Sequence, residues 1–140
     1  VIDIGSGAGF PGLVLALYFK HYGGPEVHLV ESDSKKCFFL TEVSRQTKAC
    51  VVVHTSRSEA ISDLKGDVIT ARALAPLRKL IKISRNFDEG DATYIFLKGA
   101  KAREELTDAQ KEWTMNVTKT TSQTLSVATV LTLKGVKYRE

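Results

Sequence analysis

The sequence predicts an α/β fold with a doubly wound, mostly parallel sheet that ends in an antiparallel hairpin. Short apolar runs rich in β-branched residues alternate with segments of helical periodicity over most of the chain. A glycine-rich stretch joins the first of these runs to the first helical segment. Near the end, two β-rich runs follow each other with no room for a crossover helix. This alternation is typical of a sheet covered by helices on both faces.

The expected elements follow one another in order. Strands are expected at residues 1–4, 26–32, 50–54, 67–71 and 92–98. Helices are expected between them at 11–22, 34–48, 56–64 and 75–87. After the segment 103–113, the β-rich runs at 114–122 and 124–134 are expected to pair at the sheet edge. Right-handed crossovers make this a Rossmann-like domain whose ligand-binding groups collect at the carboxyl ends of the strands.

Composition sets limits on the function. The 140 residues, 43% hydrophobic and 26% charged, fit one globular domain. No apolar run is long enough for a membrane span and no signal peptide is recognisable, so a cytoplasmic protein is expected. The net charge of +4 permits a nucleic-acid partner without requiring one. Cys37 and Cys50 are interpreted as packing residues, and no metal site is expected.

The glycine-rich loop has the spacing Asp-x-Gly-x-Gly-x-Gly, formed by Asp3, Gly5, Gly7 and Gly9. In the dinucleotide fingerprint Gly-x-Gly-x-x-Gly, the third glycine allows the helix to pack closely on the strand. Phe10 stands at that position here. The loop therefore suits a nucleoside cofactor without a pyrophosphate, such as S-adenosylmethionine. The alternative is that the glycines only form a tight turn between strand and helix.

Two acidic positions could serve the same ligand. Glu31 ends the second expected strand, where a carboxylate can accept hydrogen bonds from ribose hydroxyls. The alternative for Glu31 is an exposed charge at a strand end. Ser56 and Glu59 have the spacing of a capping box, which by itself would explain both residues structurally.

Several stretches together resemble one family, the bacterial small-subunit ribosomal RNA guanine-N7 methyltransferases, also called the glucose-inhibited division protein B family. They are DIGSGAGFPG, VESDSKKCFFL, SRSE, ITARALAPL and FLKG, in the family's order and spacing. The resemblance implies one methyltransferase domain over residues 1–140. It implies an enzyme that uses S-adenosylmethionine to methylate N7 of a guanine in 16S ribosomal RNA, and a monomer when full length.

The resemblance also implies which residues contact the cofactor. They are Gly5 and Phe10 in the loop, Glu31 as the ribose-binding acid, Ser58 and Glu59 on the adenine side, and Arg72 after the fourth strand. Gly7 joins them through the loop spacing. Family members carry a helical segment before the loop, and Val1 begins inside an apolar run, so the sequence is expected to be a fragment. The apolar outer side of residues 12–20 is expected to need a cover.

The chemistry agrees with the residues available. Guanine N7 has an in-plane lone pair and no proton, so orientation and desolvation suffice and no catalytic base is assigned. The place after the fourth strand reads TARALAPL, which lacks the Asn/Asp-Pro-Pro-aromatic run of exocyclic-amine methyltransferases. Neither cysteine is placed as the nucleophile that a carbon-5 pyrimidine methyltransferase needs.

Contacts with RNA are expected from basic residues. Lys98, at the end of the fifth strand, is expected to touch the target nucleotide or its phosphate. Arg78, Lys82 and Arg85 share one helix face, which is either a phosphate-binding stripe or a solvated surface. Two other functions stay open at this point. One is a nicotinamide-dependent oxidoreductase on a similar sheet, and the other is a non-catalytic RNA-binding or ribosome-assembly module.

Overall fold

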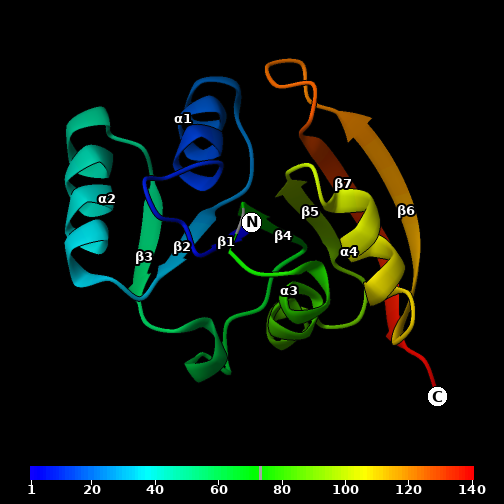
Figure 1. The fold of residues 1–140 in the computed structure, drawn as a ribbon. Coiled ribbons are helices and arrows are strands. Elements are labelled where there is room, and N and C mark those ends of the chain that lie inside the picture. The colour runs from blue at the N-terminus through cyan, green and yellow to red at the C-terminus, as the bar shows by residue number, and fades with distance from the viewer. Residues whose placement is uncertain (73) are drawn as a thin grey trace.

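The computed structural model describes residues 1–72 and 74–140 and contains one seven-stranded sheet in the order β3-β2-β1-β4-β5-β7-β6 (Figure 1). Strands β1 to β5 are parallel, and β7 runs antiparallel to both β5 and β6. The strands are β1 (Ile2–Ile4), β2 (Val27–Glu31), β3 (Val51–Thr55), β4 (Val68–Arg72), β5 (Thr93–Lys98), β6 (Trp113–Thr121) and β7 (Thr129–Tyr138). The predicted fold class is therefore confirmed, including the terminal hairpin.

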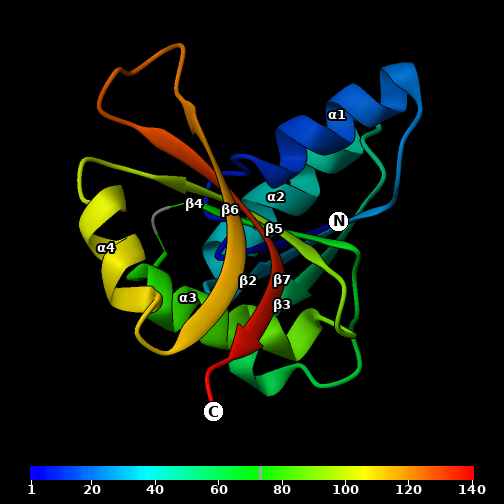
Figure 2. The same cartoon turned by 90° about the vertical axis from the view of Figure 1, so that its right-hand side faces the viewer.

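Helices cover both faces of the sheet. They are α1 (Gly12–Tyr22), α2 (Ser34–Thr47), α3 (Leu77–Ser84) and α4 (Ala102–Ala109). Figure 2 shows α1 and α2 on one side of the sheet and α3 and α4 on the other. No helix in the described ranges is long and apolar enough to cross a membrane.

Two apolar clusters form the core. The larger one lies between the sheet and α3 and α4, and the smaller one lies between β2 and the helices α1 and α2. β1 separates them, because Ile2 and Ile4 belong to the larger cluster while Asp3 points to the opposite face. This alternation is the period-2 pattern of a buried strand.

Two sequence-based expectations are wrong. The helix expected over 56–64 is reduced to a single 3₁₀ turn, η1 (Ser58–Ala60), after which Ile61 is extended. The segment holds few apolar residues, and Ile61 and Leu64 reach the larger core cluster without a helix. Cys37 is buried as expected, but Cys50 is exposed just before the edge strand β3 and is not a packing residue.

Candidate functional site

A cavity of about 430 Å³ opens at the carboxyl ends of β1, β2 and β4. In the sheet, β2 and β3 lie on one side of β1, whereas β4 and β5 lie on the other. In doubly wound sheets, ligands bind at the point where the strand order reverses in this way. Its walls are the glycine loop after β1, the end of β2, the residues around η1 and the connection from β4 to α3. Among the predicted residues, those lining it are Gly5, Gly7, Glu31, Ser58, Glu59 and Arg72.

The glycine loop is fixed against β2 by its backbone. The N–H groups of Gly5 and Ser6 donate to the carbonyl oxygen of Val30 at 2.9 and 3.1 Å. Gly5 and Gly7 have φ values of +65° and +55°, a region that residues with a Cβ rarely adopt. The loop therefore presents bare backbone to the cavity.

Glu31 joins the end of β2 to this loop. One carboxylate oxygen accepts a hydrogen bond from Gly7 N at 3.0 Å, and the other accepts one from Asp33 N at 3.0 Å. Glu31 is only 8% exposed, so the alternative of an exposed strand-end charge is wrong. Each oxygen keeps a second lone pair with which it can accept a hydrogen bond from a ligand hydroxyl.

Asp3 lies beneath the loop and is fully buried. Its two carboxylate oxygens accept hydrogen bonds from Gly12 N at 3.2 Å and from the Thr70 hydroxyl at 2.7 Å. Burial raises the pKa of Asp3 to about 6, because desolvation penalises the charged form more than these donors stabilise it. Asp3 thus ties β1 to the first turn of α1 and to β4.

Gly12 is a structural residue of the loop that the sequence analysis missed. A Cβ at this position would lie 2.5 Å from Leu29 Cδ2 and 2.6 Å from Asp3 Oδ2, so only glycine allows α1 to approach the sheet this closely. Gly12 performs the packing role that the third glycine has in the dinucleotide fingerprint, two positions after Phe10. The signal for it was the glycine that follows Phe-Pro in the loop.

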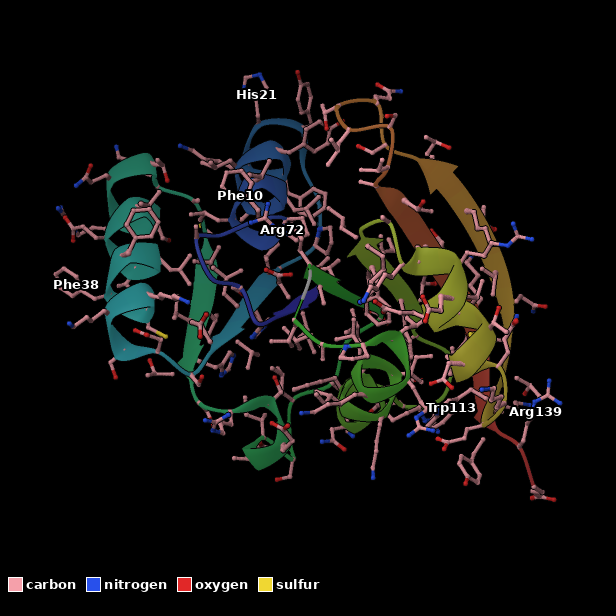
Figure 3. The ribbon with its side chains drawn as sticks, viewed as in Figure 1. Phe10, His21, Phe38, Arg72, Trp113 and Arg139 are labelled. Atoms are coloured by element: carbon pink, nitrogen blue, oxygen red, sulfur yellow. The ribbon has the colours of Figure 1, made fainter. Side chains whose placement is uncertain are left out.

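Phe10 and Arg72 meet at the rim of the cavity (Figure 3). The Arg72 guanidinium carbon lies 5.4 Å from the centroid of the Phe10 ring, within cation–π range. The Phe10 side chain is 51% exposed and contributes nothing to the cavity lining formed by the described residues, whereas Arg72 does. A direct contact of Phe10 with a cofactor stays a prediction.

The capping-box interpretation of Ser56 and Glu59 is wrong. The Ser56 hydroxyl donates to the Arg57 carbonyl oxygen at 3.1 Å, and η1 has no side-chain cap. Ser58 is buried and Glu59 is exposed, and both line the cavity. That they contact the adenine side of a cofactor stays a prediction. Three cations that the sequence analysis did not single out for this site also line the cavity, namely Lys36, Arg57 and Lys79.

Three of the four basic residues considered for RNA contact, Arg78, Arg85 and Lys98, have partners within the protein. Arg78 pairs with Glu112 at 2.9 Å, and Arg85 pairs with Asp88 at 2.9 Å. These pairs favour a solvated surface over a phosphate-binding stripe. The Lys98 ammonium donates to the Ala75 carbonyl oxygen at 2.7 Å. A contact of Lys98 with the target nucleotide stays a prediction.

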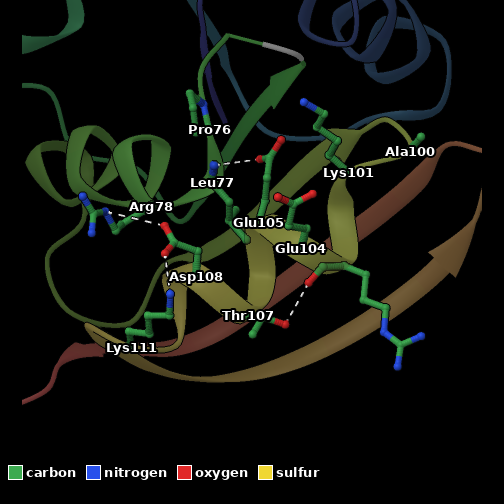
Figure 4. A pocket seen from close by; sticks show the side chains of 11 residues that line it. Pro76, Leu77, Arg78, Ala100, Lys101, Glu104, Glu105, Thr107, Asp108 and Lys111 are labelled. Carbon is green, nitrogen blue, oxygen red and sulfur yellow. Dashed lines mark hydrogen bonds and ion pairs between the residues drawn. The ribbon is translucent and has the colours of Figure 1, made fainter.

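A larger hollow of about 740 Å³ lies elsewhere, between α3 and α4 (Figure 4). Charged side chains from the two helices and the residues next to them form most of its lining, and neither the glycine loop nor the end of β2 lines it. We therefore place the functional site at the strand ends. Within the described ranges, no group of three or more His, Cys, Asp or Glu side chains could hold a metal ion.

Comparisons with known proteins identify the family of this chain. Residues 1–132 match the family model described as rRNA small subunit methyltransferase G. The chain is 50% identical over 117 residues to ribosomal RNA small subunit methyltransferase G of Rhodospirillum rubrum, covering 84% of this chain and 56% of that protein. It is 47% identical over 136 residues to the protein of the same name from Paramagnetospirillum magneticum, covering 97% and 64%. The chain thus spans less than two thirds of either relative.

Solved structures share the fold. A ribosomal protein L11 methylase from Lactobacillus delbrueckii superposes with a TM-score of 0.73 at 18% identity, covering 99% of this chain and 69% of that one. M. jannaschii TYW2, solved in complex with AdoMet, gives a TM-score of 0.67 at 16% identity, covering 99% and 68%. At these identities the likeness establishes the architecture alone.

Proposed function

Because the chain belongs to the rRNA small subunit methyltransferase G family, we propose that it binds S-adenosylmethionine and transfers a methyl group to N7 of a guanine in small-subunit ribosomal RNA. Such a substrate places the proposed activity in the cytoplasm. The observation that carries the cofactor assignment is the buried carboxylate of Glu31, which lies between the glycine loop and the cavity. Family membership disfavours the oxidoreductase and the non-catalytic module.

The residues present fit a nucleoside cofactor. A volume of about 430 Å³ is within the usual range of small-molecule sites. Glu31 would hold the ribose hydroxyls, and the bare backbone at Gly5 and Gly7 would lie against the sugar and the amino-acid portion. Ser58 and Glu59 would form the adenine side.

When bound, the cofactor supplies a methyl group on a positively charged sulfonium. The protein's part is then to orient the acceptor and to exclude water, because guanine N7 needs no proton removed before it attacks. Arg72 would act at the rim of the site, where it is exposed and its guanidinium lies over the Phe10 ring. No described residue has to act as a general base.

The test uses the full-length protein. Calorimetric titration is expected to show binding of S-adenosylmethionine and of its demethylated product, but not of NAD. Transfer from labelled cofactor to small-subunit ribosomal RNA is expected to give a product mapped to guanine N7. Tighter binding of NAD, or a label on another base position, would contradict the proposal.

A variant pair connects the activity to Glu31. Glu31→Ala is expected to lower the cofactor affinity by about 1.5–3 kcal/mol, since it removes a charged hydrogen-bonding partner. The matched control is Glu89→Ala, which removes an exposed carboxylate far from the cavity lining. Equal affinities in the two folded variants would show that Glu31 does not contact the cofactor.

A further inference from the structure

A buried ion pair at the end of β5 has no part in the proposed chemistry. The Lys98 ammonium lies 2.7 Å from Glu105 Oε2, and the two side chains are 5% and 22% exposed. Lys98 is the last residue of β5 and Glu105 belongs to α4. A lysine buried in this way needs a partner, because an isolated charge in a protein interior is strongly destabilising.

The same pair binds the backbone of the connection between β4 and α3. Lys98 Nζ donates to the carbonyl oxygen of Ala75 at 2.7 Å, and Glu105 Oε2 accepts from Leu77 N at 2.8 Å. Leu77 is the first residue of α3, so its N–H has no partner inside the helix and a carboxylate there is favourable. Figure 4 shows Glu105 directed at this N–H.

This connection is one wall of the cavity. Leu74 and Ala75 both line it, and the Leu74 side chain packs on the glycine loop, where a Cβ on Gly5 would lie 2.6 Å from Leu74 Cδ1. On its other side, Ala75 lines a neighbouring hollow of about 400 Å³ together with Lys98 and Glu105. The ion pair therefore lies directly behind the wall.

We propose that Lys98 and Glu105 are positioning residues that fix the connection at residues 74–77, so that Leu74 and Ala75 close the cavity on the bound cofactor. The identity of that cofactor rests on the proposed function. Neither residue lines the cofactor cavity as the described residues define it, so both act through the backbone of Ala75 and Leu77. Lys98 thereby has a role that does not require contact with RNA.

The experiment compares Lys98→Met, Glu105→Leu and the double variant with the wild-type protein. Each single variant leaves one buried charge without its partner and is expected to lose stability. The double variant has no unpaired charge from this pair and is expected to regain most of the lost stability. The control is Lys101→Met, because Lys101 lines the same hollow but is exposed and forms no ion pair among the described residues.

Three measurements separate positioning from stability, namely urea unfolding, amide exchange at Leu77 and calorimetric titration with S-adenosylmethionine. The double variant is expected to bind the cofactor about tenfold more weakly and to exchange the Leu77 amide faster, despite its regained stability. Glu105→Gln keeps a neutral acceptor for that amide. Its cofactor affinity and its Leu77 exchange rate are therefore expected to lie between those of the double variant and the wild type. It also serves if the double variant does not fold.

The proposal would be overturned if the double variant bound the cofactor with wild-type affinity and exchanged the Leu77 amide at the wild-type rate. If only Glu105→Gln folds, the same two results in that variant would overturn it. The pair would then have a purely structural role. If the wild-type protein does not bind S-adenosylmethionine, the proposed function is wrong. The exchange rate of the Leu77 amide alone then tests whether Lys98 and Glu105 fix the connection. Faster exchange in these variants than in Lys101→Met would support the positioning role, and equal exchange would refute it.

Discussion

Asp3 is a carboxylate in the middle of a buried strand, and its surroundings give the stability of the fold a dependence on pH. The pKa of Asp3 is raised to about 6, whereas an unfolded chain gives about 3.9. Between these values the folded state binds the proton more tightly. The stabilisation from this group is therefore complete below about pH 4 and is lost as the pH rises through 6, by roughly 3 kcal/mol.

Asp3→Asn is expected to remove this dependence. The amide keeps an acceptor for Gly12 N and can donate to the Thr70 hydroxyl, and it carries no charge at any pH. The difference in unfolding free energy between variant and wild type, measured in urea, should grow in favour of the variant from about pH 4 to about pH 8. Asp91→Asn, at an exposed position, is the control. A difference that stays constant with pH would refute the argument.

Arg72→Lys keeps the charge but loses the planar guanidinium that lies over the Phe10 ring. We expect weaker cofactor binding or slower methyl transfer. The cation–π interaction that is lost contributes about 0.5–1 kcal/mol at an exposed site. Calorimetry and transfer assays on Arg72→Lys, beside the remote control Arg103→Lys, provide the check. If Arg72→Lys had wild-type cofactor affinity and a wild-type rate of methyl transfer, the planar shape of the guanidinium would have no role in the site.

At single residues, the sequence predicted those parts of the site that a local feature of the chain marks. The glycine loop and Glu31 were identified because a short loop and a strand end are local features. The ion pair of Lys98 with Glu105 and the cavity position of Lys79 were not, because they depend on how separate elements meet. The capping box predicted for Ser56 and Glu59 is not formed, because the Ser56 hydroxyl donates to the carbonyl oxygen of Arg57 instead.

At the scale of elements, the packing of α1 on β1 and β2 depends on one glycine. Gly12→Ala is expected to destabilise the fold by about 1–3 kcal/mol, because the added Cβ would overlap Leu29 and Asp3. Gly99→Ala is the matched control, since a Cβ there meets no atom within 4 Å. Urea denaturation measures both. An unchanged midpoint for Gly12→Ala would show that α1 can shift away from the sheet at little cost.

The five parallel strands were predicted to within one or two residues, as with 92–98 expected and Thr93–Lys98 observed, whereas the last strand was expected at 124–134 and is observed at Thr129–Tyr138. In β1, β2 and β4 most residues are buried, as in a parallel sheet covered on both faces, and such apolar runs are a strong local signal for a strand. The helix expected over 56–64 did not form beyond Ser58–Ala60. That stretch has no continuous apolar stripe, and burial of such a stripe is what stabilises most helices.

At the scale of the whole molecule, the outer face of α1 is apolar and open to solvent. Val14, Tyr18 and Tyr22 follow one another at helical spacing and all are exposed. Burying such a side chain contributes about 1.5–3 kcal/mol, so the described chain is expected to associate with rising concentration. Tyr18→Lys should reduce this association in light scattering, whereas Thr41→Lys on α2 should not. A wild-type chain that stays monomeric at all concentrations would contradict this expectation.

The position of β7 in the sheet has a consequence for aggregation. Among the described strands β7 comes last in the sequence, yet it lies inside the sheet, between β5 and β6. A chain without β7 could pair β1 to β5, but its β5 edge would lack a neighbour. Such an open edge can pair with another chain. Protection of this edge from aggregation therefore depends on β7, which follows every residue of the cofactor cavity in the sequence.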